Sequence, residues 1–209
     1  MSHITRRTFG ATGLAFTLAG QASFAQQPQN VRVRGTVEGV DGNLVTVKSR
    51  DGAELKLKLK DNAVVRAVIP AKITDIKAGS KVGITSSPQA DGSLSAIEVH
   101  IFPAEQNVNA VHFGWDLMPN TFMTNGPVQQ SVAAVDGQVL TVQYKSGDKT
   151  EEKQIKVTPK TAIVTYEPAS KAELKPGAKV FVAAAPKLPD GSLDVANISY
   201  GKDGLTPPM

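Results

Sequence analysis

The sequence predicts an all-β protein built from two tandem, homologous, small OB-like β-barrels. An ordered central segment joins the barrels, and an N-terminal export signal precedes them. Three observations support this prediction: segments that recur in the same order, short strand-like runs separated by Asp-Gly turns, and a leader that carries paired arginines. They divide the chain into residues 1–25, 30–103, 104–130, 131–202 and 203–209.

The leader contains Arg6 and Arg7 followed closely by Phe9, an order typical of the bacterial twin-arginine export route. A mildly apolar run follows, and a small-x-small site at Ser23-Phe24-Ala25 suits cleavage after Ala25. An ordinary secretory leader with an accidental arginine pair is the alternative. We expect a twin-arginine signal and a mature protein that is located in the periplasm.

Composition limits the classes of partner. Removing Arg6 and Arg7 with the leader lowers the formal net charge from +4 to +2, so charge argues only weakly for nucleic acid or anionic membrane. The chain has no cysteine, which excludes disulfides and thiolate chemistry. No run after the leader has the length of a membrane span, so we expect no integral membrane segment in the mature chain.

Three segments repeat in order, which indicates a duplicated unit. Their offset grows slightly along the chain, as short insertions in surface loops would produce. The matched pairs are residues 40–47 with 135–142, residues 76–82 with 174–180, and residues 91–94 with 190–193.

Short strands separated by tight turns fill each copy. Leu55, Leu57 and Leu59 alternate with lysines, which is the period of a half-buried strand. Asp-Gly pairs between apolar runs indicate hairpins, because glycine accepts the positive φ that such turns require. The strands expected in the first copy are residues 31–40, 44–48, 54–59, 63–66, 81–85 and 94–101.

Each copy also carries one predicted helical turn. Residues 170–177 begin with a serine cap and end at Pro-Gly, and residues 71–79 occupy the same place in the first copy. Ile76 and Leu174 could close one end of a barrel. Six short strands with one such turn favour a small, nearly closed barrel, since closure removes exposed strand edges.

The order V-x-G-x-V, V-D-G-x-x-x-T-V, D-G, L-K-x-G-x-K-V, D-G-S-L resembles a bacterial exported family of unknown function with tandem OB-like small barrels. The opening element is Val33-Arg34-Gly35-Thr36-Val37 in the first copy, whereas residues 131–135 of the second copy lack the glycine. Residues 123–125 and the tail from Gly201 resemble a subgroup sometimes labelled metal-transporter permease. A permease would need membrane spans that this sequence lacks, and the resemblance implies no catalytic residues.

The central segment holds the candidate binding residues. It is too apolar for a flexible linker, so we expect it to pack across both barrels. Phe113, Trp115 and Phe122 would be apolar anchors, and Asp116 or His112 a polar orienter, of a ligand at the junction. The alternative is that these aromatic residues only form an inter-barrel core.

A soft-metal site is the second hypothesis. His112, Met118 and Met123 are residue types that copper prefers, although their spacing fits no standard site. His100 and Glu98 lie on the polar face of their strand, so we expect His100 to be a solvated surface histidine.

Catalysis and nucleic-acid binding have little support. No nucleophile, base and orienting group can be named together. Lys56, Lys58 and Lys60 form a cationic strand face without the aromatic platforms that bind single strands. The sequence therefore favours a non-catalytic binding or scaffold protein of the periplasm, without a cofactor, whose partner is an envelope protein, a polymer or a small ligand. The alternative is a periplasmic protein that binds copper or zinc or is associated with metal transport.

Overall fold

The computed structural model describes residues 30–209 and is all-β, as the sequence predicts. The predicted signal, with Arg6, Arg7 and Ala25, lies outside these residues. Within residues 30–209 no helix has the length and apolarity required to cross a bilayer. The strands are β1 (Asn30–Asp41), β2 (Leu44–Ser49), β3 (Glu54–Pro70), β4 (Lys81–Pro88), β5 (Leu94–Ile101), β6 (Val111–Trp115), β7 (Thr121–Ala134), β8 (Gly137–Ser146), β9 (Lys149–Val157), β10 (Ala162–Ala169), β11 (Lys179–Pro186) and β12 (Leu193–Gly201), with 3₁₀ turns η1 (Ile73–Asp75), η2 (Lys171–Glu173) and η3 (Lys202–Gly204).

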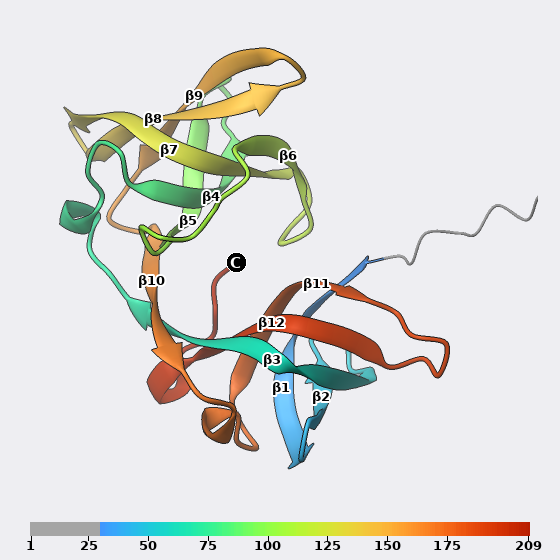
Figure 1. The fold of residues 1–209 in the computed structure, drawn as a ribbon. Coiled ribbons are helices and arrows are strands. Elements are labelled where there is room, and N and C mark those ends of the chain that lie inside the picture. The colour runs from blue at the N-terminus through green and yellow to red at the C-terminus, as the bar shows by residue number, and fades with distance from the viewer. Residues whose placement is uncertain (1–29) are drawn as a thin grey trace, which may run out of the picture.

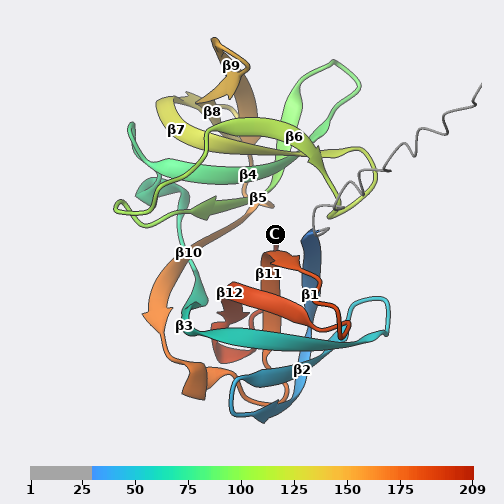
Figure 2. The same ribbon diagram turned by 45° about the vertical axis from the view of Figure 1, so that its right-hand side comes forward.

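The strands form two closed five-stranded barrels (Figure 1). The first barrel closes through the order β1, β2, β3, β12, β11 and back to β1. The second barrel closes through β4, β5, β9, β8, β7 and back to β4. The remaining strands are β6, which pairs with β7, and β10, which runs between the barrels (Figure 2).

Each barrel combines strands from both sequence copies. The expected division, with one barrel in residues 30–103 and the other in residues 131–202, is wrong about which strands close each barrel. Strand β1 pairs with β11 of the second copy, and β7 of the second copy pairs with β4 of the first. Ile69 and Glu167 each precede a proline and lie in extended strands, a backbone conformation that proline favours in the preceding residue. Beyond each proline the chain continues into the opposite barrel and does not fold back.

The crossing point lies on a pseudo-twofold axis. Strands β3 and β10 pair antiparallel, and Val68 lies opposite Tyr166, its equivalent in the second copy. Other pairings between the two copies are also equivalent. Strand β12 of the second copy runs parallel to β3 of the first, and β5 of the first copy runs parallel to β9 and β10 of the second. The axis places the outer faces of β5 and β12 between the barrels.

Separate apolar cores stabilise the two barrels. Leu57 and Leu59 are buried in the first barrel while the intervening lysine faces outward, which confirms the predicted alternation. Burying a leucine side chain contributes roughly 1.5–3 kcal/mol. The helical turns are also exchanged: Ile76 of the first copy is buried in the second barrel, and Leu174 of the second copy in the first barrel.

A close backbone approach identifies the true first strand of the second copy. A Cβ atom at Gly35 would lie 2.4 Å from the carbonyl oxygen of Lys48, and one at Gly126 would lie 2.0 Å from that of Gln143. The counterpart of residues 33–37 is therefore residues 124–128, not residues 131–135 as expected. The predicted connecting segment, residues 104–130, thus includes much of β7, and the connection between copies runs over residues 102–120.

Because the natural sequence has no cysteine, an introduced pair can test the exchange. Thr36 on β1 and Lys179 on β11 are register partners. We expect a Thr36→Cys/Lys179→Cys variant to form an intramolecular disulfide on mild oxidation, detected by intact mass and a non-reducing peptide map. The control is Thr36→Cys/Lys81→Cys, because Lys81 is the first-copy equivalent of Lys179. Efficient cross-linking of the control, with none in the first variant, would show that each copy closes its own barrel.

Candidate ligand-binding site

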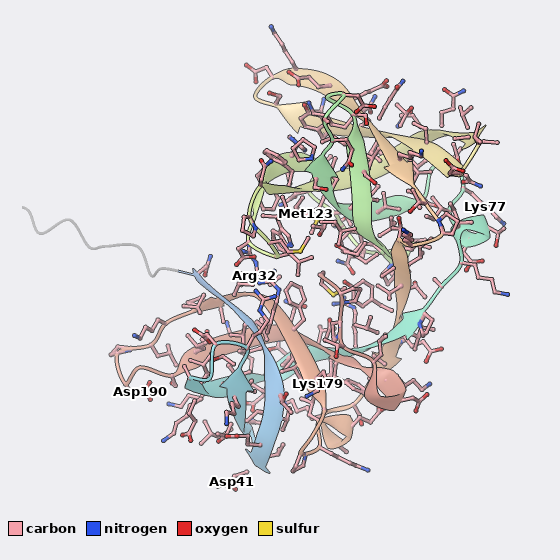
Figure 3. All side chains as sticks on the ribbon, turned by 180° about the vertical axis from the view of Figure 1, so that it is seen from behind. Arg32, Asp41, Lys77, Met123, Lys179 and Asp190 are labelled. Atoms are coloured by element: carbon pink, nitrogen blue, oxygen red, sulfur yellow. The ribbon has the colours of Figure 1, made fainter. Side chains whose placement is uncertain are left out.

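A cavity of about 450 Å³ lies between the two barrels, and we call it the central cavity. Both barrels and the connecting segment contribute to its wall. Figure 3 shows Met123 and Arg32 beside this junction. The lining residues are Arg66, His100, Phe102, Gln106, Asn107, Trp115, Met123, Asn125, Tyr166, Phe181, Ala183, Ala184, Asn197, Ser199 and Met209.

Equivalent positions of the two copies face this cavity with different chemistry. His100 on β5 corresponds to Ser199 on β12, and Glu98 corresponds to Asn197. These residues stand on the outer faces of their barrels, where the opposite barrel covers them. The duplicated fold therefore provides one polar position twice, and only the first copy carries an ionisable pair there.

Glu98 and His100 form the buried pair. Their exposed fractions are 0% and 5%, so the expectation that His100 is a solvated surface histidine is wrong. The Nδ1 atom of His100 lies 3.0 Å from Glu98 Oε2, and the Thr85 hydroxyl donates to Glu98 Oε1 at 2.6 Å. Because an ionised carboxylate only accepts hydrogen bonds, Nδ1 carries the proton and Nε2 is an acceptor in the neutral ring.

A glycine makes room for this imidazole. A Cβ atom at Gly83 would lie 2.0 Å from His100 Nε2 and 2.7 Å from Asn125 Oδ1. The equivalent of Gly83 in the second copy is Phe181, whose ring lines the cavity. The absence of a side chain at residue 83 thus leaves room for the His100 imidazole on the second-barrel side of the cavity.

Aromatic rings form part of the wall near the pseudo-twofold axis. Phe102 and Tyr166 are stacked with centroids 6.1 Å apart, and the Phe102 ring meets His100 edge-on at 4.7 Å. Burial raises the pKa of Tyr166, and the nearby Glu98 carboxylate adds to the shift. The phenol is therefore neutral, and the stacked rings offer a flat apolar surface.

Three buried polar atoms of cavity-lining residues have no hydrogen-bond partner among residues 30–209. They are Gln106 Oε1, Trp115 Nε1 and Asn125 Oδ1, and each belongs to a residue that lines the cavity through other atoms. Leaving such a group unsatisfied costs about 1–3 kcal/mol, so buried polar atoms are normally paired. Three residues with unpaired polar atoms thus stand around one cavity with aromatic walls.

Trp115 is held at the cavity by two arginines of β1. The guanidinium carbon of Arg32 lies 3.8 Å from the centre of the Trp115 ring. Asp116 Oδ1 bridges both arginines, at 2.9 Å from Arg32 Nη1 and 2.8 Å from Arg34 Nη2. Partial burial raises the pKa of Asp116, but the hydrogen bonds from Arg34 and Arg32 outweigh it and lower the pKa to about 2. Asp116 thus fixes the connecting segment and does not line the cavity.

The other predicted ligand-binding residues are divided between two faces of the β6–β7 hairpin. Phe113 packs edge-on against Trp115 at 5.7 Å but is largely exposed. Phe122 stacks on His112 at 5.3 Å, on the side away from the cavity. Of the four predicted residues, Phe113, Trp115, Asp116 and Phe122, only Trp115 lines the central cavity.

The structure does not assemble the predicted metal set of His112, Met118 and Met123. In the β6–β7 ladder His112 is paired with Thr124, and Met123 with Phe113, so the His112 and Met123 side chains point to opposite faces. Met118 is 49% exposed on the following turn. In the described part of the chain no group of three or more His, Asp or Glu side chains is placed to hold a metal ion.

The tail also contributes to the site. Met209, the last residue of the sequence, is buried against Val68, Val164 and Phe181. Its carbonyl oxygen accepts a hydrogen bond of 2.8 Å from Arg34 Nε. The predicted C-terminal tail, residues 203–209, therefore packs between the barrels and forms part of the cavity wall.

The sequence analysis missed His100, Asn125 and Arg66 as cavity residues. Glu98 and His100 lie on the same face of one strand. This pattern could have indicated the site, because two ionisable side chains on one strand face need either solvent or hydrogen-bond partners. Gly126, the equivalent of Gly35, was a second signal, because it places the neighbouring Asn125 on a barrel strand.

No family model, curated protein or solved structure matches this chain. The resemblance to an exported family of unknown function therefore stays a prediction, and function must be inferred from the central cavity.

Replacing Gly83 with alanine should destabilise the site. The new methyl group would meet His100, which cannot move freely because Glu98 and Phe102 hold its ring. We expect Gly83→Ala to lower the free energy of unfolding in urea by about 1–3 kcal/mol. Gly114→Ala is the matched control, since its Cβ would meet nothing within 4 Å. Equal stability of the two variants would contradict this packing.

The Asp116 bridge should depend on pH. Because its pKa is lower in the folded state than the ordinary 3.8, its stabilising effect is complete above about pH 4 and disappears as the pH falls to about 2. With a side chain 53% exposed, the effect is below about 1 kcal/mol. We expect Asp116→Asn to lower the Tm slightly at pH 6 and not at pH 2, whereas the exposed control Asp148→Asn changes neither. A difference that grows on acidification would contradict the bridge.

Proposed function

We propose that this protein binds a small ligand in the central cavity without catalysing a reaction, and that it does so in the periplasm after export. The observation that carries the proposal is one cavity with aromatic walls that is also lined by Gln106, Trp115 and Asn125, each of which has a buried polar atom without a partner among residues 30–209. A volume of about 450 Å³ falls within the range of small-molecule sites.

The shape of the site favours a small molecule over a polymer or a protein surface. Residues of both barrels line the cavity together with the buried Met209. Figure 1 shows that the C-terminal end of the chain lies between the barrels. An extended polymer would need a continuous open groove. Export through the twin-arginine route is supported by the order of Arg6, Arg7, Phe9 and Ala25 in the sequence.

Binding is favoured over catalysis by the hydrogen bonds of the buried pair. A carboxylate that orients a histidine also occurs in hydrolases, where the other ring nitrogen activates a hydroxyl. Here the Thr85 hydroxyl donates to Glu98 and not to His100, and within residues 30–209 no hydroxyl hydrogen-bonds to His100 Nε2. We therefore assign His100 to ligand recognition.

Trp115 is the only tryptophan, so its fluorescence reports on the cavity directly. We expect that screening small aromatic compounds, neutral and charged, will yield compounds that both shift the Trp115 emission and raise the Tm. Asn125→Ala should weaken such binding about threefold to tenfold, the effect of one lost hydrogen bond. Asn109→Ala, at an exposed site on the connecting segment, is the control. A library without a single binder, or binders indifferent to Asn125→Ala, would contradict the proposal.

A further inference from the structure

We propose that the ligand is a small aromatic monocarboxylate that also carries a hydroxyl or N–H group on the far side of its ring. This inference rests on the proposed function, because it assumes that the central cavity binds a ligand. It follows from a difference between the two walls: the first barrel presents the Arg66 guanidinium, and the second barrel presents Asn125 and the His100 that is paired with Glu98.

The donor wall consists of Arg66 and Ser199. They are register partners on β3 and β12, so their side chains stand next to each other on the same face, and both line the cavity. The Arg66 guanidinium is partly buried and makes no ion pair or hydrogen bond with any residue from 30 to 209, whereas Arg32 and Arg34 are both paired with Asp116. A planar guanidinium beside a hydroxyl matches the two oxygens of a carboxylate.

The acceptor wall consists of His100 and Asn125 on β5 and β7. In the tautomer whose Nδ1–H donates to Glu98, the Nε2 atom is an acceptor. Asn125, which also lines the cavity, has an Oδ1 atom without a donor. A hydroxyl or N–H group on the ligand could donate to these side chains, which a carboxylate oxygen cannot do.

Aromatic side chains line the same cavity. Phe102 and Tyr166 are stacked on one side, and Trp115 and Phe181 lie 6.4 Å apart with their rings tilted at 62°. A flat ring between them gains apolar contact and offset or edge-to-face aromatic packing. A ligand ring that carries the anionic group at one end and the donor group at the other would use both polar walls and the aromatic side chains.

A buried charge limits the ligand to one negative charge. Glu98 is completely buried and is held by Thr85 and His100, not by Arg66. In a poorly hydrated site, charges interact more strongly than they do in water. Arg66 can balance a monoanion, but a second negative charge would face the Glu98 carboxylate without a counterion. A carboxylate is therefore favoured over a phosphate monoester.

The test compares three probes on the full mature chain: 4-hydroxyphenylacetate, its amide, and phenylacetate. Binding is measured by calorimetry and by Trp115 emission. We expect 4-hydroxyphenylacetate to bind at least about tenfold more tightly than the amide, which lacks the charge, and severalfold more tightly than phenylacetate, which lacks the hydroxyl. Binding of the amide as tight as that of the acid overturns the inference while leaving the proposed function intact, because the cavity still binds a ligand.

Substitution of the guanidinium provides the second arm. Arg66→Gln should reduce the affinity for 4-hydroxyphenylacetate about tenfold or more and leave the affinity for the amide unchanged. Arg50→Gln is the matched control, because Arg50 is exposed and does not line the central cavity. An equal loss for the acid in both variants, or no loss in Arg66→Gln, overturns the inference. If Arg66→Gln fails to fold, the comparison of the three probes on the natural protein still decides the matter.

Discussion

The antiparallel pairing of β3 with β10 is the contact on which the rest of the structure depends. It places Val68 opposite its own equivalent, Tyr166, and so defines the axis that relates the two copies. Beyond this pairing each strand leads into a helical turn and then into the other barrel, with Ile76 and Leu174 buried in cores that the opposite copy begins. If these strands turned back, each barrel would have to close with strands of a single copy. The junction is therefore a hydrogen-bonded part of the sheet and not a contact between independent modules.

An axis of this kind has a chemical consequence for the junction. It brings the same strand face from both copies to one place, so each substitution in a copy alters only one side of the cavity. The first copy has Gly83 and His100 where the second has Phe181 and Ser199. One side thus gained a buried imidazole with its carboxylate, and the other gained an aromatic ring and a small hydroxyl. Duplication produced a symmetric frame, and divergence of a few positions made its interior directional.

Much of the fold could be predicted from local patterns. Some features depend only on neighbours in sequence, and the structure confirms them. They are the alternation at Leu57 and Leu59, the Asp-Gly turns, and the burial of Ile76 and Leu174 in barrel cores. Strand exchange depends on which of two equivalent partners β1 meets, and equivalent partners have nearly the same sequence. Local patterns therefore cannot distinguish them. The same ambiguity prevented prediction of the site. The sequence correctly places His100 on the outer face of its barrel, but only the strand exchange decides whether water or the other barrel covers that face.

The exchanged topology also constrains how the polypeptide matures during synthesis. Strand β1 is among the first described strands to leave the ribosome, yet its partner β11 begins at Lys179, near the end of the chain. A nascent chain that has emerged only as far as the connecting segment holds no complete barrel and exposes the edges of both. Closure of the first barrel must therefore wait until nearly the whole protein has been synthesised.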